Sequence, residues 1–275
     1  MKEYAFHIVD TTLRDGEQSP GLALSSRDKM ILAQRLDALG VYEIEGGIPA
    51  MGTLEQEAVK GMSLLCRRAR IAAWNRLSLQ DIEASIACSP DIVHISVPVS
   101  DLQIQKKLQK DRDWIERSVR ECIAYARERG YAVTAGFEDA SRADMQFMIR
   151  LGRQLKEQGV SYLRFADTVG ILTPQETYDK IKTLRDASAM DIEFHAHNDL
   201  GMAVANSIAA VQAGARYIDT TLGGVGERAG NCSLAEFLEA VSLEYEIPFR
   251  IEAVQETAAL ASKLFGLQDG KDVSL

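Results

Sequence analysis

The chain has 275 residues, of which 46% are hydrophobic and 26% charged, and its formal net charge is -9. These values fit a soluble globular protein and suit a single α/β barrel, whereas the acidic balance argues against a nucleic-acid surface, which needs a basic face. No stretch approaches the roughly 20 apolar residues of a membrane span. We therefore expect a cytoplasmic protein that binds neither nucleic acid nor a membrane. The four cysteines are scattered, without a Cys-x-x-Cys pair, which predicts reduced thiols.

Short apolar runs alternate with helical patterns along nearly the whole chain. The predicted strands cover residues 4–9, 41–45, 71–74, 92–96, 131–137, 160–165, 192–195 and 216–219. The predicted helices cover about 26–39, 53–66, 78–87, 111–129, 142–158, 174–187, 201–213 and 233–243. Several helices end at a glycine, which is typical of helix C-termini.

Eight strand–helix units predict an α/β fold of the (β/α)8 TIM barrel type. We expect the catalytic barrel to span residues 1–245, followed by a short helical C-terminal extension, 246–275, with a helix at about 252–265. A doubly wound open sheet is the alternative. That fold would usually place Gly-x-Gly-x-x-Gly after the first strand, but this loop reads Arg-Asp-Gly-Glu-Gln.

Polar residues gather after the predicted strands, where a barrel has its active site. They are Arg14, Asp15, Glu45, Asn75, Arg76, Glu138, Asp167, Thr168, His195, His197 and a glycine-rich loop that ends at Asn231. His94 instead lies inside an apolar strand run, where a core histidine is at least as plausible as a functional one.

The pair His195 and His197 predicts a divalent metal site. Residues two apart in a strand face the same way, roughly 6.6 Å apart along the backbone, so both imidazoles can reach one ion. Asp15 is the natural carboxylate partner, because the first, seventh and eighth strands are neighbours in a closed barrel. Zinc suits the imidazoles, while magnesium or manganese suits oxygen ligands, so the metal stays open. Beside such an ion, Arg14 could stabilise an oxyanion.

Two motifs carry a resemblance to a known family. Residues 13–18 (Leu-Arg-Asp-Gly-Glu-Gln), followed after ten residues by Lys29, resemble the first signature of the DRE-TIM metallolyases related to 2-isopropylmalate and homocitrate synthases. Residues 192–205 resemble the second signature throughout. The resemblance covers residues 5–245. It implies that Asp15, His195 and His197 are metal ligands, with Asn231 as a fourth, and that Arg14 is the catalytic arginine.

Further stretches narrow the resemblance to the homocitrate synthases of nitrogen fixation. They are residues 47–52, 97–102, 110–114, 138–144 and 164–170. Those enzymes condense acetyl-CoA with 2-oxoglutarate, and the product enters the nitrogenase cofactor. The resemblance thus implies acetyl-CoA and 2-oxoglutarate as substrates and a homodimer as the assembly. Gln18 and Thr168 are candidate substrate-binding residues, and Glu138 is a candidate catalytic carboxylate.

The chain departs from the family pattern at two places. Lysine-pathway homocitrate synthases carry an arginine for the distal carboxylate of 2-oxoglutarate where this chain has Thr134. Arg76 and Arg142 are our candidates to replace it, although each could be an ordinary surface arginine. Full-length synthases also continue into a subdomain that lends a histidine and a tyrosine to the partner's site. A complementary C-terminal subunit could supply the general base, or a barrel residue could, or the chain alone is impaired.

Three other functions compete with this interpretation. Retro-aldol lyases such as hydroxymethylglutaryl-CoA lyase have a similar length, but they carry a catalytic cysteine in the glycine-rich loop, and residues 222–231 contain none. Citramalate and isopropylmalate synthases differ by a few pocket side chains. A barrel subunit active only with a partner chain is the alternative from another class.

Overall fold

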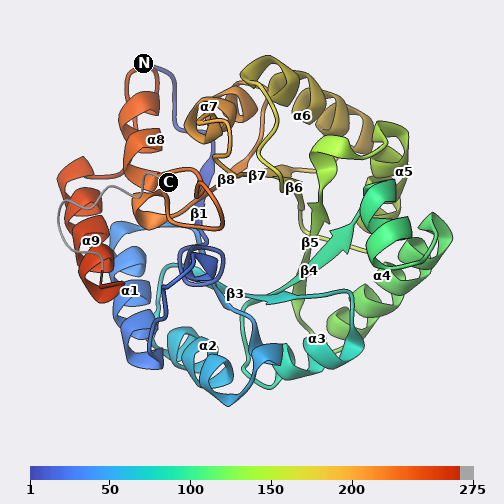
Figure 1. Cartoon of the computed structure of the whole chain (residues 1–275), viewed down its shortest axis with the longest axis horizontal. Helices are drawn as coiled ribbons and strands as arrows, with labels where there is room; N and C mark the ends of the chain where they lie inside the picture. Colours follow the sequence, from blue (N-terminus) through green and yellow to red (C-terminus); the bar gives the residue numbers. More distant parts are fainter. Residues whose placement is uncertain (267–275) are drawn as a thin grey trace.

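Eight parallel strands close into a barrel in sequence order (Figure 1). The computed structural model describes residues 1–266. The strands are β1 (His7–Asp10), β2 (Glu43–Gly47), β3 (Arg70–Asn75), β4 (Ile92–Pro98), β5 (Ala132–Glu138), β6 (Leu163–Asp167), β7 (Ile192–Ala196) and β8 (Tyr217–Thr220). The pairing of β1 with both β2 and β8 closes the ring and confirms the predicted (β/α)8 architecture.

A ring of helices covers the outside of the barrel (Figure 1). The helices are α1 (Ser26–Leu39), α2 (Thr53–Leu65), α3 (Leu79–Ile86), α4 (Arg112–Arg127), α5 (Met145–Glu157), α6 (Pro174–Ser188), α7 (Ala203–Gln212), α8 (Leu234–Val241) and α9 (Ile251–Leu264). Short helical turns occupy the βα loops: η1 (Gly16–Gln18), η2 (Pro49–Met51), η3 (Leu102–Lys107), η4 (Ala140–Arg142) and η5 (Leu222–Gly224).

Local signals set the helix ends. Ser25 begins α1 with a capping box, in which its side chain accepts from the backbone N–H of Asp28 while the Asp28 side chain accepts from that of Ser25. Gly40 ends α1 with φ of 88°, a conformation that costs glycine little. Thr173 begins α6 with a second capping box. The predicted helices therefore agree closely with the observed ones.

Several strands begin later than predicted. The first predicted strand starts at residue 4, whereas β1 starts at His7. Phe6 precedes the strand and packs in the apolar layer beside α8, with its ring 5.7 Å from the rings of Phe237 and Tyr245. The sixth predicted strand starts at residue 160, whereas β6 starts at Leu163. Apolar residues just before a strand can pack in the layer between strands and helices without pairing in the sheet, so hydrophobicity alone extends the predicted strand too far toward its N-terminus.

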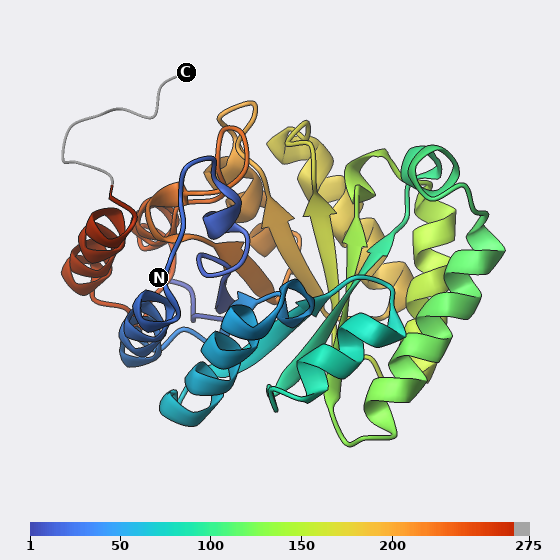
Figure 2. The ribbon, with the colours of Figure 1, turned by 60° about the horizontal axis from the view of Figure 1, so that its bottom comes forward.

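The interior of the barrel differs from the apolar layer between strands and helices. A small cluster of Val9, Tyr162 and Tyr217 fills the lower interior, and the two tyrosine rings stack with centroids 4.1 Å apart. Two residues further along β6 and β8, on the same face, come Arg164 and Asp219, both buried. The interior thus changes from aromatic to charged toward the carboxyl ends of the strands, which Figure 2 shows side by side.

Helix α9 lies in the outer ring between α8 and α1 (Figures 1 and 2). It buries Val254 and Ala261. The helix predicted at 252–265 is therefore present and packs on the barrel. The division of the chain at residue 245 stays a prediction, and the last part of the predicted extension, 267–275, lies outside the described residues.

Within residues 1–266, none of the helices combines the length and the apolar character needed to cross a membrane.

Candidate active site

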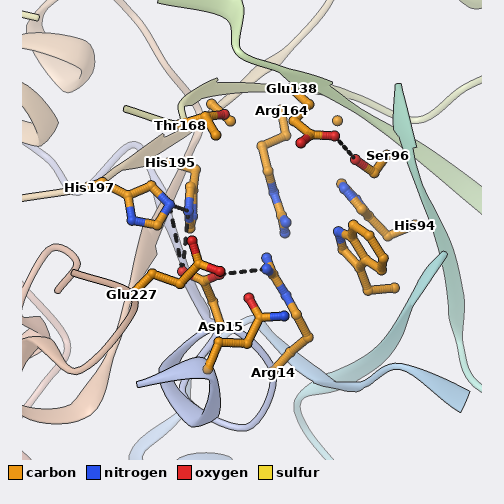
Figure 3. Close-up of a pocket in the computed structure, with 14 residues that line it drawn as sticks. Arg14, Asp15, His94, Ser96, Glu138, Arg164, Thr168, His195, His197 and Glu227 are labelled. Atoms are coloured by element: carbon orange, nitrogen blue, oxygen red, sulfur yellow. Dashed lines mark hydrogen bonds and ion pairs between the residues drawn. The ribbon is translucent and has the colours of Figure 1, made fainter. Parts of the chain in front are cut away.

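A cavity of about 210 Å³ opens at the carboxyl ends of the strands (Figure 3). It is smaller than the pockets of about 300–1,000 Å³ that hold drug-sized ligands, so it suits a small metabolite. The residues that line it are Arg14, Asp15, Gln18, Trp74, His94, Ser96, Gly136, Glu138, Arg164, Ala166, Thr168, His195, His197 and Glu227. The predicted location of the site agrees with this cavity.

Asp15, His195 and His197 bring three metal-ligating atoms together within 4.8 Å of one another. Asp15 Oδ2 lies 3.5 Å from His195 Nε2 and 3.9 Å from His197 Nε2, and the two Nε2 atoms are 3.3 Å apart. Ligands bound at about 2.0–2.2 Å around one ion stand roughly 3–3.5 Å from each other. The donor atoms therefore fit a divalent metal ion.

Both imidazoles are neutral, and a hydrogen bond orients that of His195. His195 Nδ1 donates to Asp219 at 2.9 Å, which leaves Nε2 free to face the cavity. Burial is the main cause that lowers the pKa of His195 to about 4, and it lowers that of His197 to the same value. Near neutral pH both rings therefore carry a free lone pair, as a metal ligand requires.

Asn231 lies against the same cluster. An isolated bridge pairs its backbone with that of His197, and its amide donates to Asp15 Oδ2 at 2.7 Å. Its Oδ1 is buried without a partner. The amide nitrogen, and not Oδ1, therefore faces Asp15, and Asn231 does not line the cavity, so its role as a fourth metal ligand stays a prediction.

Arg14 is held between two carboxylates. Its guanidinium bonds Asp15 at 2.6 Å and Glu45, and it lies 5.6 Å from the ring centre of Trp74. Burial alone would raise the pKa of Asp15, but the charge of Arg14 opposes it, a hydrogen bond from Asn231 adds to this effect, and the pKa of Asp15 lies well below its usual range. Asp15 is therefore ionised wherever the chain is folded near neutral pH.

Arg164 is a site residue to which the sequence analysis gave no role. Its guanidinium reaches Glu45 at 2.8 Å, Glu193 at 2.9 Å and Asp219 at 3.0 Å. Through Asp219 it supports His195, and through Glu45 it supports Arg14. An arginine inside an apolar strand run was the available signal, since charged residues are almost never fully buried unless paired.

The other predicted residues that line the cavity come from three loops. Glu138 ends β5 and accepts hydrogen bonds from Ser96 at 3.2 Å and Gln103 at 3.1 Å. Thr168 follows β6, and its hydroxyl accepts from the backbone N–H of Asp139 at 2.8 Å. Gln18 belongs to η1. Trp74, Ser96 and Glu227 also line the cavity but were not predicted.

Arg76 and Arg142 require a correction, because neither lines the cavity. The Arg76 side chain is 69% exposed and binds Asp81 at 2.6 Å, and Arg142 is held by Asp139 at 2.8 Å. Position after a strand misled the prediction. A carboxylate three or five residues along the chain captured each guanidinium outside the barrel mouth.

The HMGL-like family matches residues 5–260, which include all eight strands of the barrel and most of α9. The chain belongs to this family. Similar proteins include homocitrate synthase subunit alpha of Clostridium pasteurianum, 52% identical over 86% of this chain and 87% of that protein. A 2-isopropylmalate synthase of Caldanaerobacter subterraneus is 43% identical over 95% of this chain and 69% of its own length. A homocitrate synthase of Frankia is 44% identical, with 89% of this chain and 61% of that protein covered.

The same fold occurs in solved structures. The hydroxymethylglutaryl-CoA lyase of Pseudomonas aeruginosa superposes with a TM-score of 0.86 at 19% identity, covering 98% of this chain and 96% of that one. At this identity the likeness supports the barrel fold alone.

Proposed function

We propose that this chain catalyses the condensation of acetyl-CoA with 2-oxoglutarate, which yields homocitrate and CoA. The observation that carries the proposal is the cluster of Asp15, His195 and His197 beside Arg14 in one small cavity. Support for the substrates comes from the homocitrate synthases among the relatives, which reach 52% identity. A role in supplying the nitrogenase cofactor rests on the resemblance of residues 47–52 and 164–170 to the nitrogen-fixation enzymes.

In this proposal Asp15, His195, His197 and Asn231 hold one divalent metal ion, which is magnesium, manganese or zinc. When bound, the ion supplies Lewis-acid chemistry and a binding point for the carboxylate and keto oxygens of a 2-oxo acid. Asp219 keeps the His195 ring in the tautomer that leaves Nε2 unprotonated. Thr168 and Gln18, both at the cavity wall, contact the bound acid.

The reaction makes one carbon–carbon bond and breaks one thioester. The acetyl methyl group loses a proton, its carbon adds to the keto carbon, and water then releases CoA from the thioester. Arg14 faces the cavity with its charge fixed by Asp15 and Glu45, so it stabilises the negative charge that develops on the keto oxygen. Glu138, whose carboxylate faces the cavity from the end of β5, is our candidate for proton transfer.

The assembly we propose is a homodimer, with a complementary C-terminal subunit as a second source of proton-transferring groups. The Clostridium relative, which this chain covers to 87%, is itself named as a subunit. The Frankia relative is longer, since this chain covers 61% of it.

The test is thiol release from acetyl-CoA by the full chain with divalent metal and a panel of 2-oxo acids. We expect release that depends on 2-oxoglutarate and that disappears in His195→Ala. The same variant of His7, which lies at the opposite end of the barrel interior, should retain activity and serves as the control.

The same panel of 2-oxo acids distinguishes the competing functions by the acid that each would use. Release with 2-oxoisovalerate or pyruvate in place of 2-oxoglutarate would identify an isopropylmalate or citramalate synthase, in line with the relative of Caldanaerobacter. If no 2-oxo acid gives thiol release although 2-oxoglutarate still binds, a partner chain must be added for activity.

A further inference from the structure

The loop after β8, residues 222–231, forms part of the wall of the active-site cavity. Glu227 lines that cavity (Figure 3), whereas Gly226 and Arg228 on either side of it line a separate cavity of about 280 Å³. Four of the ten residues of the loop are glycine, which loses more conformational freedom on folding than any other residue. The loop therefore needs contacts outside itself to keep Glu227 in one position.

Ser19 holds the loop on the side of β1. Its hydroxyl donates to the carbonyl of Gly226 at 2.5 Å and accepts from the backbone N–H of the same residue at 2.8 Å. Ser19 directly follows η1, in the loop that also carries Arg14 and Asp15. One side chain thus engages both backbone polar groups of Gly226, the residue immediately before Glu227.

Arg228 holds the loop on the other side of Glu227. Its Nε and Nη2 atoms donate to the two carboxylate oxygens of Asp199 at 2.7 and 2.9 Å, and Nη2 also donates to the carbonyl of Thr168 at 2.8 Å. Thr168 follows β6, Asp199 follows β7 and Arg228 follows β8. Bidentate arginine–carboxylate pairs are among the stronger and more specific polar contacts. One guanidinium therefore joins three consecutive βα loops, in an arrangement that we call the Arg228 clamp.

Two backbone features indicate that the Arg228 clamp is a fixed arrangement. Arg228 has φ of 53°, a left-handed conformation that is unfavourable for a residue with a Cβ and that persists where its surroundings require it. Gly170, in the loop after β6, has φ of 60°, and a Cβ at this position would lie 2.4 Å from Asp199 Oδ2. The loop after β6 therefore packs directly against the carboxylate that Arg228 binds.

The residues that the clamp holds face the active-site cavity, although Arg228 itself is not among the described residues that line it. Thr168 is bound through its carbonyl to Arg228, and its hydroxyl accepts a backbone hydrogen bond at 2.8 Å. That hydroxyl keeps its own hydrogen for a ligand in the cavity. Asp199 follows His197 by two residues, and Glu227 directly precedes Arg228. Arg228 can therefore affect the cavity only through its neighbours.

We propose that Arg228 is a positioning residue: its bonds to Asp199 and Thr168 hold the loops after β6, β7 and β8 as one rigid wall, and this rigidity raises the affinity for the 2-oxo acid. The inference rests on the proposed function and adds a residue that acts without contacting the substrate. When the wall is already rigid, binding of the acid does not have to order three loops, so less conformational entropy opposes it. The side chains of Arg228 and Asp199 are 42% and 26% exposed, so we expect a moderate contribution of about 10-fold in affinity.

The test is the affinity of the full chain for 2-oxoglutarate, measured by calorimetry with Mg²⁺ and without acetyl-CoA, together with any partner chain that activity needs. Arg228→Asn removes the guanidinium but keeps a residue that adopts positive φ more readily than most. We expect the dissociation constant of 2-oxoglutarate to rise about 10-fold. KM for the acid should rise by a similar factor while kcat changes less, because the clamp affects binding more than the chemical step.

Three further variants separate positioning from a general loss of stability. Arg228→Lys keeps the charge but cannot form the planar bidentate pair, so its affinity should lie between those of Arg228→Asn and the wild type. Asp199→Ala breaks the same clamp, so combining it with Arg228→Asn should lose no more affinity than either change alone. Arg150→Gln is the matched control, because Arg150 binds Glu116 through Nε and Nη2 at 3.2 and 2.9 Å on the outside of the barrel, and the affinity should stay unchanged.

Amide hydrogen exchange gives a readout that does not need a substrate. In Arg228→Asn, exchange should accelerate in residues 222–231 and 168–171, whereas the strands should exchange as in the wild type. If Arg228→Asn does not fold, Arg228→Lys and Asp199→Ala provide the same comparison.

The outcomes separate this inference from the proposed function. If the wild-type chain binds 2-oxoglutarate and Arg228→Asn binds it equally well, the inference alone is wrong. It is also wrong if the losses of affinity from Arg228→Asn and Asp199→Ala are additive. If the wild-type chain neither binds nor converts 2-oxoglutarate, the proposed function is wrong and this inference with it.

Discussion

Glu43 lies deep in the barrel, below the charged cluster of the active site. Its carboxyl accepts a hydrogen bond from the Tyr162 hydroxyl, and its other oxygen is buried without a partner. Burial, together with the nearby Glu193, raises the pKa of Glu43 to about 8. The barrel interior therefore holds more carboxyl groups than Arg164 can neutralise. Glu43 consequently stays protonated near neutral pH.

Glu43→Gln should change how stability depends on pH. Because the folded chain holds this proton more tightly than the unfolded chain, its stabilisation is complete below pH 4.5, the ordinary pKa, and is lost as pH rises toward 8. The amide of the variant stays neutral at every pH. The free energy of unfolding of the variant should therefore rise relative to that of the wild type by about 1.4 kcal/mol per pH unit within this window. Urea unfolding at pH 5, 7 and 9 measures the difference.

The control for this prediction is Glu57→Gln on the exposed face of α2, which should show a flat difference across the same pH range. If the difference in free energy of unfolding between Glu43→Gln and the wild type is also independent of pH, Glu43 is ionised in the folded chain.

Individual site residues were predicted where the chain itself showed a spacing or a motif. The pair at His195 and His197 was visible because a strand repeats every two residues. Arg164 had no such pattern, since its partners Glu45 and Asp219 come from other strands. Arg76 was misplaced because a nearby aspartate decides its direction, which the strand position alone does not reveal.

At the scale of elements, the loops after β1 and β2 are joined by one buried lysine. Lys29, on α1, places its ammonium against Glu17 and Glu55. Glu17 in turn accepts from the backbone N–H of Leu24 at 2.9 Å, and Glu55 from that of Ile48 at 3.0 Å. This lysine triad therefore supports the loop that carries Arg14, Asp15 and Gln18.

Lys29→Met should loosen that loop. Both glutamates would lose their cation in a half-buried site, which we expect to lower the free energy of unfolding by about 1–3 kcal/mol. Amide hydrogen exchange at residues 17–24 should accelerate, and thermal unfolding reports the stability. Lys60→Met on the exposed side of α2 is the matched control. Unchanged exchange in Lys29→Met would show that the triad does not support the loop.

The order and type of elements could be predicted because each strand has its own apolar run, and several helices have a capping side chain at the start or a glycine after the end. The starts of the strands could not be predicted, because apolar residues that precede a strand, such as Phe6, also pack in the core without pairing in the sheet. The turn η3 also escaped prediction, since a single π-type turn has no repeating pattern to detect.

At the scale of the whole molecule, the candidate metal cluster brings together residues from the beginning and from the end of the barrel sequence. Asp15 follows β1, whereas His195 and His197 come from β7 and the residues after it. The seam between them is closed by the pairing of β1 with β8. A bound ion would hold both sides of this seam.

Adding Mn²⁺ to the metal-free chain should therefore raise its stability. At a concentration of about 100 times Kd, a ligand that binds only the folded chain adds about 2.7 kcal/mol. Thermal unfolding with and without the ion measures this gain, which His197→Ala should abolish and His7→Ala should preserve. An equal gain in His197→Ala would place the ion elsewhere.

The seam also has a consequence for the order of events during synthesis. A ribosome that has made residues 1–190 has already released Arg14, Asp15 and Gln18, but their counterparts on β7 and β8 do not yet exist. Glu45 and Arg164 are likewise translated before Asp219, their common neighbour in the folded site. The site therefore lacks its partners from β7 and β8 until residues 192–220 have been made. Metal loading of the site therefore has to follow the synthesis of β7 and His197.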